Sequence, residues 1–96
     1  MKYLLILQGD AELCAPDHDR FRKVADESGE LITGHLLADP STGLVIGTGP
    51  ANPIRAYYLI DVDTLDRATH LAHLLPESEA LAVEIRPIMQ QSAADY

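Results

Sequence analysis

Residues 55–62 have the sequence RAYYLIDV, and this stretch decides which fold the chain can adopt. Aromatic and β-branched residues favour strands, so we expect a strand here. Successive side chains of a strand point to opposite faces of the sheet. Both sets of side chains are apolar: Tyr57 with Leu59, and Tyr58 with Ile60 and Val62. Because helices can cover only one of these faces, the other face needs a different partner.

Outside this stretch, the sequence predicts four further strands. Short apolar or alternating runs occur at residues 2–9, 31–38, 44–49 and 81–88. The turn-forming sequence DPSTG at residues 39–43 separates the second and third of these runs. Two strands joined by such a turn predict a hairpin.

Two helices are predicted between the strands. The first spans residues 17–28 and is followed by Gly29, a residue that often ends a helix. The second begins after Asp63, the expected N-cap, and ends at Pro76. Each has an apolar stripe at helical spacing. The stripes are Phe21, Val24, Ala25 and Ser28 in the first helix, and Leu65, Ala68, Leu71, Ala72 and Leu75 in the second.

The predicted order is β-α-β-β-β-α-β, which favours an α+β domain with an antiparallel sheet and both helices on one face. The uncovered apolar face of the central strand is most simply buried by a second copy of the chain. We therefore expect a homodimer. The domain should span residues 1–88, followed by a polar tail at residues 89–96.

Composition excludes several classes of partner. The chain of 96 residues has 15 acidic and 7 basic side chains and a net charge of −8. Nucleic acids and anionic membranes would repel it. The apolar run in MKYLLIL is too short for a signal peptide or a membrane span. A lone cysteine, Cys14, excludes an internal disulfide, so we expect a cytoplasmic protein.

Five segments of the sequence resemble the YCII-related family, also called the DGPF-domain family. The segments are MKYLLILQGD, SGELITGHLL, GTGP, YYLIDVDTLDRA and AVEIRPI, and the likeness covers residues 1–88. The resemblance implies a ferredoxin-like subunit that pairs into a dimeric α+β barrel. It also implies a small-molecule enzyme related to isomerases and lyases of that barrel.

The chain departs from the family pattern at two places. The Asp-Gly-Pro-Phe signature is replaced by Thr48-Gly49-Pro50-Ala51, and His35 replaces a glutamate after the strand glycine. The stretch PDHDRF, residues 16–21, resembles the Pro-x-His opening of the first helix in one branch of the family. That likeness implies a catalytic pair of His18 with an aspartate, for which Asp39 is a loose match.

His18 is also a candidate on physical grounds. A histidine can exchange a proton near neutral pH and therefore suits a general base. A histidine in the first turn of a helix can equally be solvated or simply packed. His18 could bind a metal only if His35 and a third ligand such as Asp39 lay beside it. We predict no metal and no cofactor.

Further candidates are residues that could line a cleft and bind substrate. An arginine can hold a carboxylate bidentately, and a tyrosine can donate a hydrogen bond to a carbonyl. Each could instead serve only in ion pairs, the core or the dimer contact. The candidate substrate-binding residues are His35, Arg55, Tyr57, Tyr58, Glu84 and Arg86.

These observations favour a cofactor-independent small-molecule enzyme of the lyase, isomerase or hydrolase type. His18 would transfer the proton and Asp39 would orient it. The alternative is a non-catalytic homodimer that binds a small molecule or regulates another process through the same cleft. A haem or metal oxygenase on the same barrel is a third reading, supported only by the histidines.

Overall fold

The computed structural model describes residues 1–9 and 17–89. Its strands are β1 (Lys2–Gln8), β2 (Leu31–Leu36), β3 (Ile54–Asp61) and β4 (Ala82–Pro87). Its helices are α1 (Asp19–Glu27), α2 (Leu65–Ala72) and α3 (Glu77–Ala80), with a short 3₁₀ helix, η2, at Pro40–Thr42. Cys14 and most of the predicted tail lie outside the described residues.

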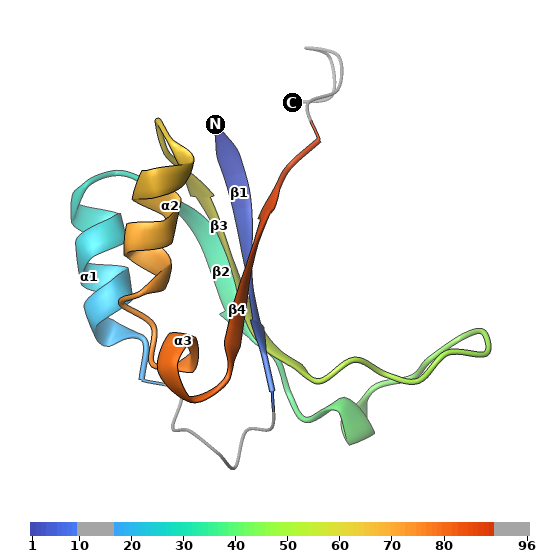
Figure 1. The fold of residues 1–96 in the computed structure, drawn as a ribbon. Coiled ribbons are helices and arrows are strands. Elements are labelled where there is room, and N and C mark those ends of the chain that lie inside the picture. Colours follow the sequence, from blue (N-terminus) through green and yellow to red (C-terminus); the bar gives the residue numbers. More distant parts are fainter. Residues whose placement is uncertain (10–16, 90–96) are drawn as a thin grey trace.

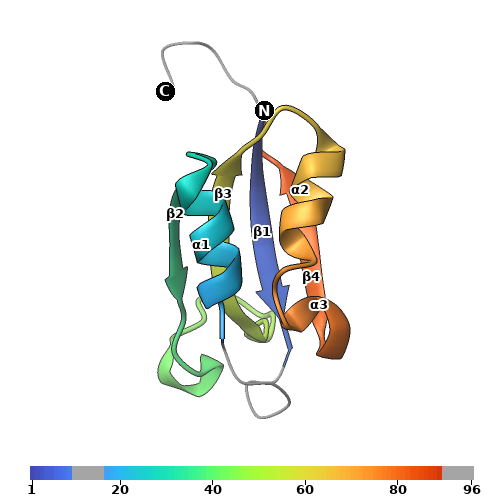
Figure 2. The same ribbon diagram turned by 90° about the vertical axis from the view of Figure 1, so that its left-hand side faces the viewer.

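The four strands form one antiparallel sheet in the order β2-β3-β1-β4. Helices α1, α2 and α3 lie on the same side of this sheet (Figures 1 and 2). The prediction of an α+β domain with helices on one face of an antiparallel sheet is confirmed. The arrangement is compatible with a ferredoxin-like fold.

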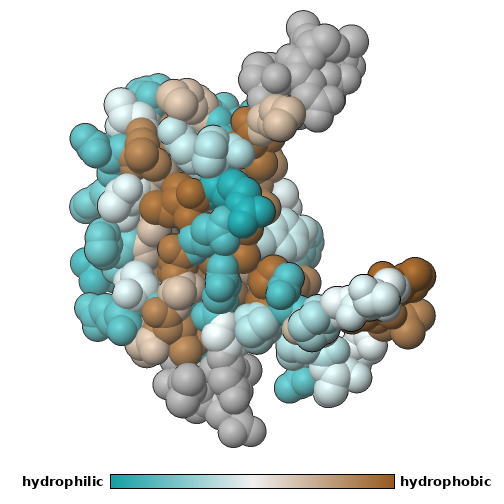
Figure 3. All heavy atoms as spheres, turned by 45° about the vertical axis from the view of Figure 1, so that its right-hand side comes forward, coloured by the Kyte–Doolittle hydropathy of each residue, from teal (hydrophilic) through white to brown (hydrophobic). Residues whose placement is uncertain are grey.

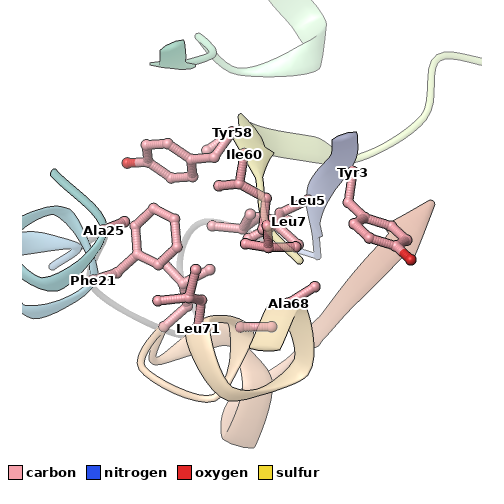
Figure 4. Packing of buried hydrophobic residues seen from close by; sticks show 13 residues of the cluster. Tyr3, Leu5, Leu7, Phe21, Ala25, Tyr58, Ile60, Ala68 and Leu71 are labelled. Carbon is pink, nitrogen blue, oxygen red and sulfur yellow. The ribbon is translucent and has the colours of Figure 1, made fainter. Parts of the chain in front are cut away.

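The core fills the space between the sheet and the helices (Figure 4). From the sheet, it receives Tyr58 and Ile60 of β3 together with Leu5 and Leu7 of β1. From the helices, it receives most of the predicted stripes, because Phe21, Ala25, Ala68 and Leu71 are fully buried. Ser28, expected on the first stripe, is exposed. Leu65, expected on the second stripe, is 53% exposed.

The other face of the sheet has no helix over it. We call it the open face, and it consists of the outward side chains of the strands. They are Leu4, Ile6 and Gln8 of β1, Thr33 and His35 of β2, Tyr57 and Leu59 of β3, and Glu84 and Arg86 of β4. Its centre is apolar, as the alternation in residues 55–62 predicts.

The predicted hairpin is wrong. Residues 31–38 do contain β2, but residues 44–49 form no strand, and β2 pairs directly with β3. Residues 37–53, which we call the arm, extend away from the sheet on the side opposite the helices (Figure 1). β3 pairs with one edge of β2, and no strand of the sheet pairs with the other edge of β2.

The helix ends also differ from the prediction. Helix α1 begins at Asp19, not at residue 17, and its N-cap is His18, so His18 precedes the first turn. Thr64, not Asp63, caps α2, because its side chain accepts a hydrogen bond from the backbone N–H of Arg67. Helix α2 ends at Ala72, before Pro76. Pro76 is the N-cap residue of α3, a helix that the sequence patterns did not indicate.

Within residues 1–9 and 17–89, we find no helix with the length and apolar character needed to cross a bilayer.

Candidate functional site

His18 lies buried at the start of α1, with both ring nitrogens engaged. The ring is 4% exposed. Its Nδ1 lies 2.7 Å from the hydroxyl of Tyr58, and its Nε2 lies 2.8 Å from Oε2 of Glu77. A donor and an acceptor position are thus both satisfied, which fixes the orientation of the imidazole.

Glu77 is the first residue of α3 and is completely buried. Its Oε2 also lies 3.4 Å from Nε of Arg55, which is itself buried. Its Oε1 has no hydrogen-bond partner among the described residues. A carboxylate in such a position is held by its ion pairs, since an isolated buried charge would be very costly.

Tyr58 connects this group to the surface of α1. Its hydroxyl accepts a hydrogen bond from Nε of Arg22 at 3.2 Å, and the Arg22 guanidinium lies 5.4 Å from the centre of the Tyr58 ring. Gly34 of β2 makes room for this ring, because a Cβ at that position would lie 2.1 Å from Cδ1 of Tyr58. The side chains from exposed Arg22 to buried Arg55 therefore form one chain of contacts, which we call the buried network: Arg22, Tyr58, His18, Glu77 and Arg55.

Arg55 reaches the helix side of the sheet through an irregularity in β3. Leu7 of β1 pairs with Ala56 and the next residue, Gln8, pairs with Ile54, so Arg55 is an extra residue in the ladder. Such a bulge redirects a side chain, and strict alternation would have placed Arg55 on the open face. The redirected arginine meets Glu77.

A cavity of about 280 Å³ lies next to Arg55 at the end of the sheet where the arm begins. The residues that line it are Gly9, Leu37, Ala38, Asp39, Pro40, Pro53, Ile54 and Arg55. The cavity therefore joins one member of the buried network to the first residues of the arm. The wall is mainly apolar with two charged side chains, the composition typical of a small-molecule site.

Asp39 lines this cavity but does not hold His18. Its carboxylate caps η2 by accepting a hydrogen bond from the backbone N–H of Ser41 at 2.8 Å. This hydrogen bond lowers the pKa of the Asp39 carboxyl. Among the described residues, the carboxylate that orients His18 is Glu77.

The other predicted binding residues lie on the open face. His35 Nδ1 is 2.8 Å from the hydroxyl of Tyr57. Glu84 accepts hydrogen bonds from Gln8 and from Arg86 of the same strand. A second cavity, of about 220 Å³, is lined by Ile6, Gln8, Asn52, Pro53, Ile54, Glu84 and Arg86.

The predicted site is therefore divided by the sheet. His18, Arg55 and Tyr58 meet on the helix side, whereas His35 and Tyr57 meet on the open face with Glu84 and Arg86 nearby. His18 and His35 cannot share a metal ion in this arrangement. Within the part of the chain that the structure describes, no three His, Cys, Asp or Glu side chains are grouped as a metal site would require.

Glu77 and Arg22 are the members of the buried network that sequence reasoning missed. The dipeptide Pro76-Glu77 is typical of a helix start, since proline is tolerated there and an acidic residue suits the helix N-terminus. That signal could have indicated α3. It could not have shown that the carboxylate turns inward, because His18 lies 59 residues away in the sequence.

Fold and site together define an α+β protein with a four-stranded antiparallel sheet, a buried His–Glu pair and a small cavity beside it. No protein-family model and no curated protein sequence matches this chain.

Proposed function

We propose that the protein is a cofactor-independent small-molecule enzyme of the lyase, isomerase or hydrolase type, related to the YCII family. The observation that supports this best is the buried network. A histidine with a carboxylate at 2.8 Å is connected through that carboxylate to an arginine in the wall of a cavity. In this proposal, Glu77 takes the orienting role that the sequence suggested for Asp39.

The hydrogen-bond pattern suits proton transfer. Arg22 donates to the Tyr58 oxygen, so the Tyr58 hydroxyl proton is available to Nδ1 of His18. His18 then donates its Nε2–H to Glu77. Hydroxyl, imidazole and carboxylate in this order have the connectivity of a general-base triad. Because His18 is buried and does not line the cavity, the group that takes the substrate proton in this proposal is the Glu77 carboxylate beside Arg55, through Oε1, and His18 holds this carboxylate through its Nε2–H.

The substrate we propose is a small organic anion. Arg55 presents a guanidinium to a mainly apolar cavity, and guanidinium groups bind carboxylates well. A cavity of about 280 Å³ is at the small end of ligand sites, which suits a metabolite of a few carbon atoms. Asp39, at the opposite side of the lining, could accept a hydrogen bond from a hydroxyl of that molecule.

The assembly we propose is a homodimer that pairs two open faces into a barrel. Four apolar side chains at the centre of that face support this: Leu4, Ile6, Tyr57 and Leu59. Two sheets with apolar faces pack at about 10 Å, with side chains interdigitating. The paired faces would also enclose His35, Glu84 and Arg86.

The competing function is binding without turnover. It is favoured by one observation: His18 has both nitrogens satisfied and does not itself line the cavity beside Arg55. In this alternative, the role of His18 is limited to holding Glu77 and Tyr58 in place. Arg55 would then bind the same small anion, and nothing would react.

The experiment that separates the two functions combines binding with proton exchange. The protein is screened by thermal shift against small oxo-, hydroxy- and enol-carboxylates and lactones, since a ligand of the native state raises its melting temperature. Those that bind are then incubated in D₂O, and NMR follows exchange of the C–H protons next to the carbonyl. An enzyme exchanges them or converts the compound, whereas a binding protein leaves them unchanged.

Three variants assign the roles. His18→Gln should slow exchange at least about 100-fold while the ligand still raises the melting temperature, because the proposed base, Glu77, loses the imidazole that holds it. Asp39→Asn should weaken binding with less effect on the rate. His73→Gln, at an exposed position on the helix side, is the matched control and should behave as wild type. Exchange that survives in His18→Gln would disprove the proposed role of His18.

A further inference from the structure

We infer that the arm docks its apolar tip onto a second copy of the chain, beside the open faces that the two copies pair, so that the dimer fixes the position of the arm. The inference rests on the proposed homodimer, but it adds a specific contact that the pairing of sheets alone does not require.

The tip of the arm is the most exposed apolar segment described. Leu44 is 88% and Ile46 is 92% exposed, with Val45 between them. Figure 3 shows this hydrophobic surface at the far end of the arm, away from the body of the molecule. Isolated apolar side chains on a surface are ordinary, but three in a row at the end of a projection indicate a contact with another surface.

The arm and the open face lie on the same side of the molecule. The arm leaves the sheet on the side without helices (Figure 1). The open face on that side has an apolar centre formed by Leu4, Ile6, Tyr57 and Leu59. One chain therefore presents both a projecting apolar tip and an apolar surface that lacks a cover.

A second copy fits this pair of surfaces better than other partners do. The arm cannot cover its own sheet in the conformation described, since Leu44 and Ile46 stay exposed. A two-fold axis that pairs the two open faces would place each arm against the other copy beside that contact, with the same contact made twice. Each chain has a net charge of −8, so two copies can approach only through surfaces with little charge.

The distribution of charge also favours a second copy of the chain as the partner of the arm. Asp39 is the one charged residue in the sequence of the arm, and it lies at the root, not at the tip. The four central side chains of the open face are uncharged. Contacts through the tip and the open face therefore avoid the repulsion that the rest of this acidic chain would cause. An anionic membrane, in contrast, would repel this acidic chain.

Docking of the arm would also shape the site. Ile54, at the point where the arm returns to β3, lines the Arg55 cavity, the open-face cavity and a third cavity of about 450 Å³. The third cavity is an open hollow lined mainly by the arm, at residues 37–40, 42–45, 51 and 52, and by Ile54 of β3. Its walls are set by the position of the arm, so a partner that fixes the arm fixes the walls of the site.

The test compares dimer affinity in arm variants. Sedimentation equilibrium over a range of concentrations gives the dissociation constant of the wild-type dimer and of a chain with Leu44→Ser and Ile46→Ser. Burial of these side chains twice per dimer predicts a dissociation constant at least about tenfold higher in the variant. If the wild-type dimer is too tight to dissociate, exchange of labelled subunits should be at least about tenfold faster in the variant.

Leu65→Ser is the matched control. Leu65 is an exposed leucine at the start of α2, on the side of the helices, and its substitution should leave the dimer unchanged. Circular dichroism checks that each variant is folded, which we expect because Leu44 and Ile46 are outside the core.

The possible results separate the arm contact from the dimer itself. An unchanged dissociation constant in the arm variant, together with dissociation of the dimer by Leu59→Asp on the open face, would overturn the arm contact and leave the dimer. A wild-type chain that is monomeric at every concentration would overturn both. Flotation of the wild-type chain with phosphatidylcholine vesicles, lost in the arm variant, would replace the second copy by a lipid surface.

Discussion

Glu77 lies between two basic side chains in the interior and contacts both. Replacement by glutamine keeps the shape but removes the charge opposite Arg55 and His18. Arg55 and His18 would both lose their contact with the buried carboxylate, so Glu77→Gln should lower the free energy of unfolding by about 3 kcal/mol. Urea unfolding at pH 7 measures the change. Glu79→Gln, two residues along on the exposed side of α3, is the matched control.

A loss below about 0.5 kcal/mol in Glu77→Gln, similar to that of Glu79→Gln, would contradict the assigned role of the ion pairs. The proposed function would then lose its support, because the buried network connects His18 to the cavity only through this carboxylate.

Gly34 is required by the ring of Tyr58. An added Cβ would lie 2.1 Å from Cδ1 of that ring and 2.8 Å from the backbone oxygen of Tyr57, which cannot move away easily. Gly34→Ala should therefore destabilise the protein by about 2 kcal/mol, as overpacking does. The ring must also shift, so the NMR signals of His18, hydrogen-bonded to Tyr58, should change.

Gly49→Ala is the control for this substitution, because nothing lies within 4 Å of a Cβ there. It should change the melting temperature little. If Gly34→Ala also left both the melting temperature and the His18 signals unchanged, the close packing of Tyr58 on β2 would be wrong.

Single residues show where sequence reasoning reached its limit. His18 and Arg55 were identified as site residues because their side-chain chemistry is distinctive wherever it occurs. Their partners were not identified, since Glu77 belongs to a helix that packs against β4 and the start of α1 only in the folded chain. The direction of Arg55 depends on a bulge, and no feature of the sequence RAYYLIDV locates that extra residue.

Helix α2 is connected to the turn before β2 by an ion pair. Nε and Nη2 of Arg67 both donate to the carboxylate of Glu30, at 2.7–3.0 Å. The hydrogen bonds from Arg67 lower the pKa of the Glu30 carboxyl below its ordinary value of 4.5. A lowered folded-state pKa contributes stability above the unfolded value, and this stability is lost as the pH falls through the folded value.

Arg67→Met should therefore be destabilised in a pH-dependent manner. At pH 7 we expect a loss of about 0.5–1 kcal/mol, modest because the pair is partly exposed. The difference from wild type should shrink below pH 4.5 as Glu30 becomes protonated in both proteins. Urea unfolding between pH 7 and pH 3 measures it. Arg20→Met, on the exposed side of α1, is the control, and a pH-independent loss in Arg67→Met would refute the pairing.

Elements with a strong internal period were predicted correctly. β3 and β4 alternate, and the stripes of α1 and α2 have helical spacing, so each segment specifies its own conformation and buried side. The residues of the arm do not specify their own conformation in this way. LVIGTG is as apolar as a strand, but it pairs with no strand of the sheet, although the outer edge of β2 has no partner strand. Only the tertiary arrangement decides between a strand and a projection.

At the scale of the whole molecule, helices cover one face of the sheet and leave the other face partly exposed. Helices bury Tyr58 and Ile60 completely, whereas Tyr57 and Leu59 on the same strand are only half-buried. The same division separates the buried network from the open-face residues His35, Glu84 and Arg86. Dimerisation would therefore bring the second group into an enclosed space without changing the first.

Leu59→Asp tests the dimer at the centre of the open face, where Leu59 pairs with Leu4 on one side and Thr33 on the other. A carboxylate there would be buried twice at a two-fold interface, which should weaken association by at least about 3 kcal/mol. Because association stabilises the folded chain by mass action, the melting temperature of the wild type should rise with protein concentration. That rise should vanish in Leu59→Asp and persist in Leu65→Asp, where the same substitution lies in the exposed first turn of α2. A wild-type melting temperature independent of concentration, with a monomer in sedimentation equilibrium, would mean that the open face is solvated and that His35, Glu84 and Arg86 line no enclosed chamber.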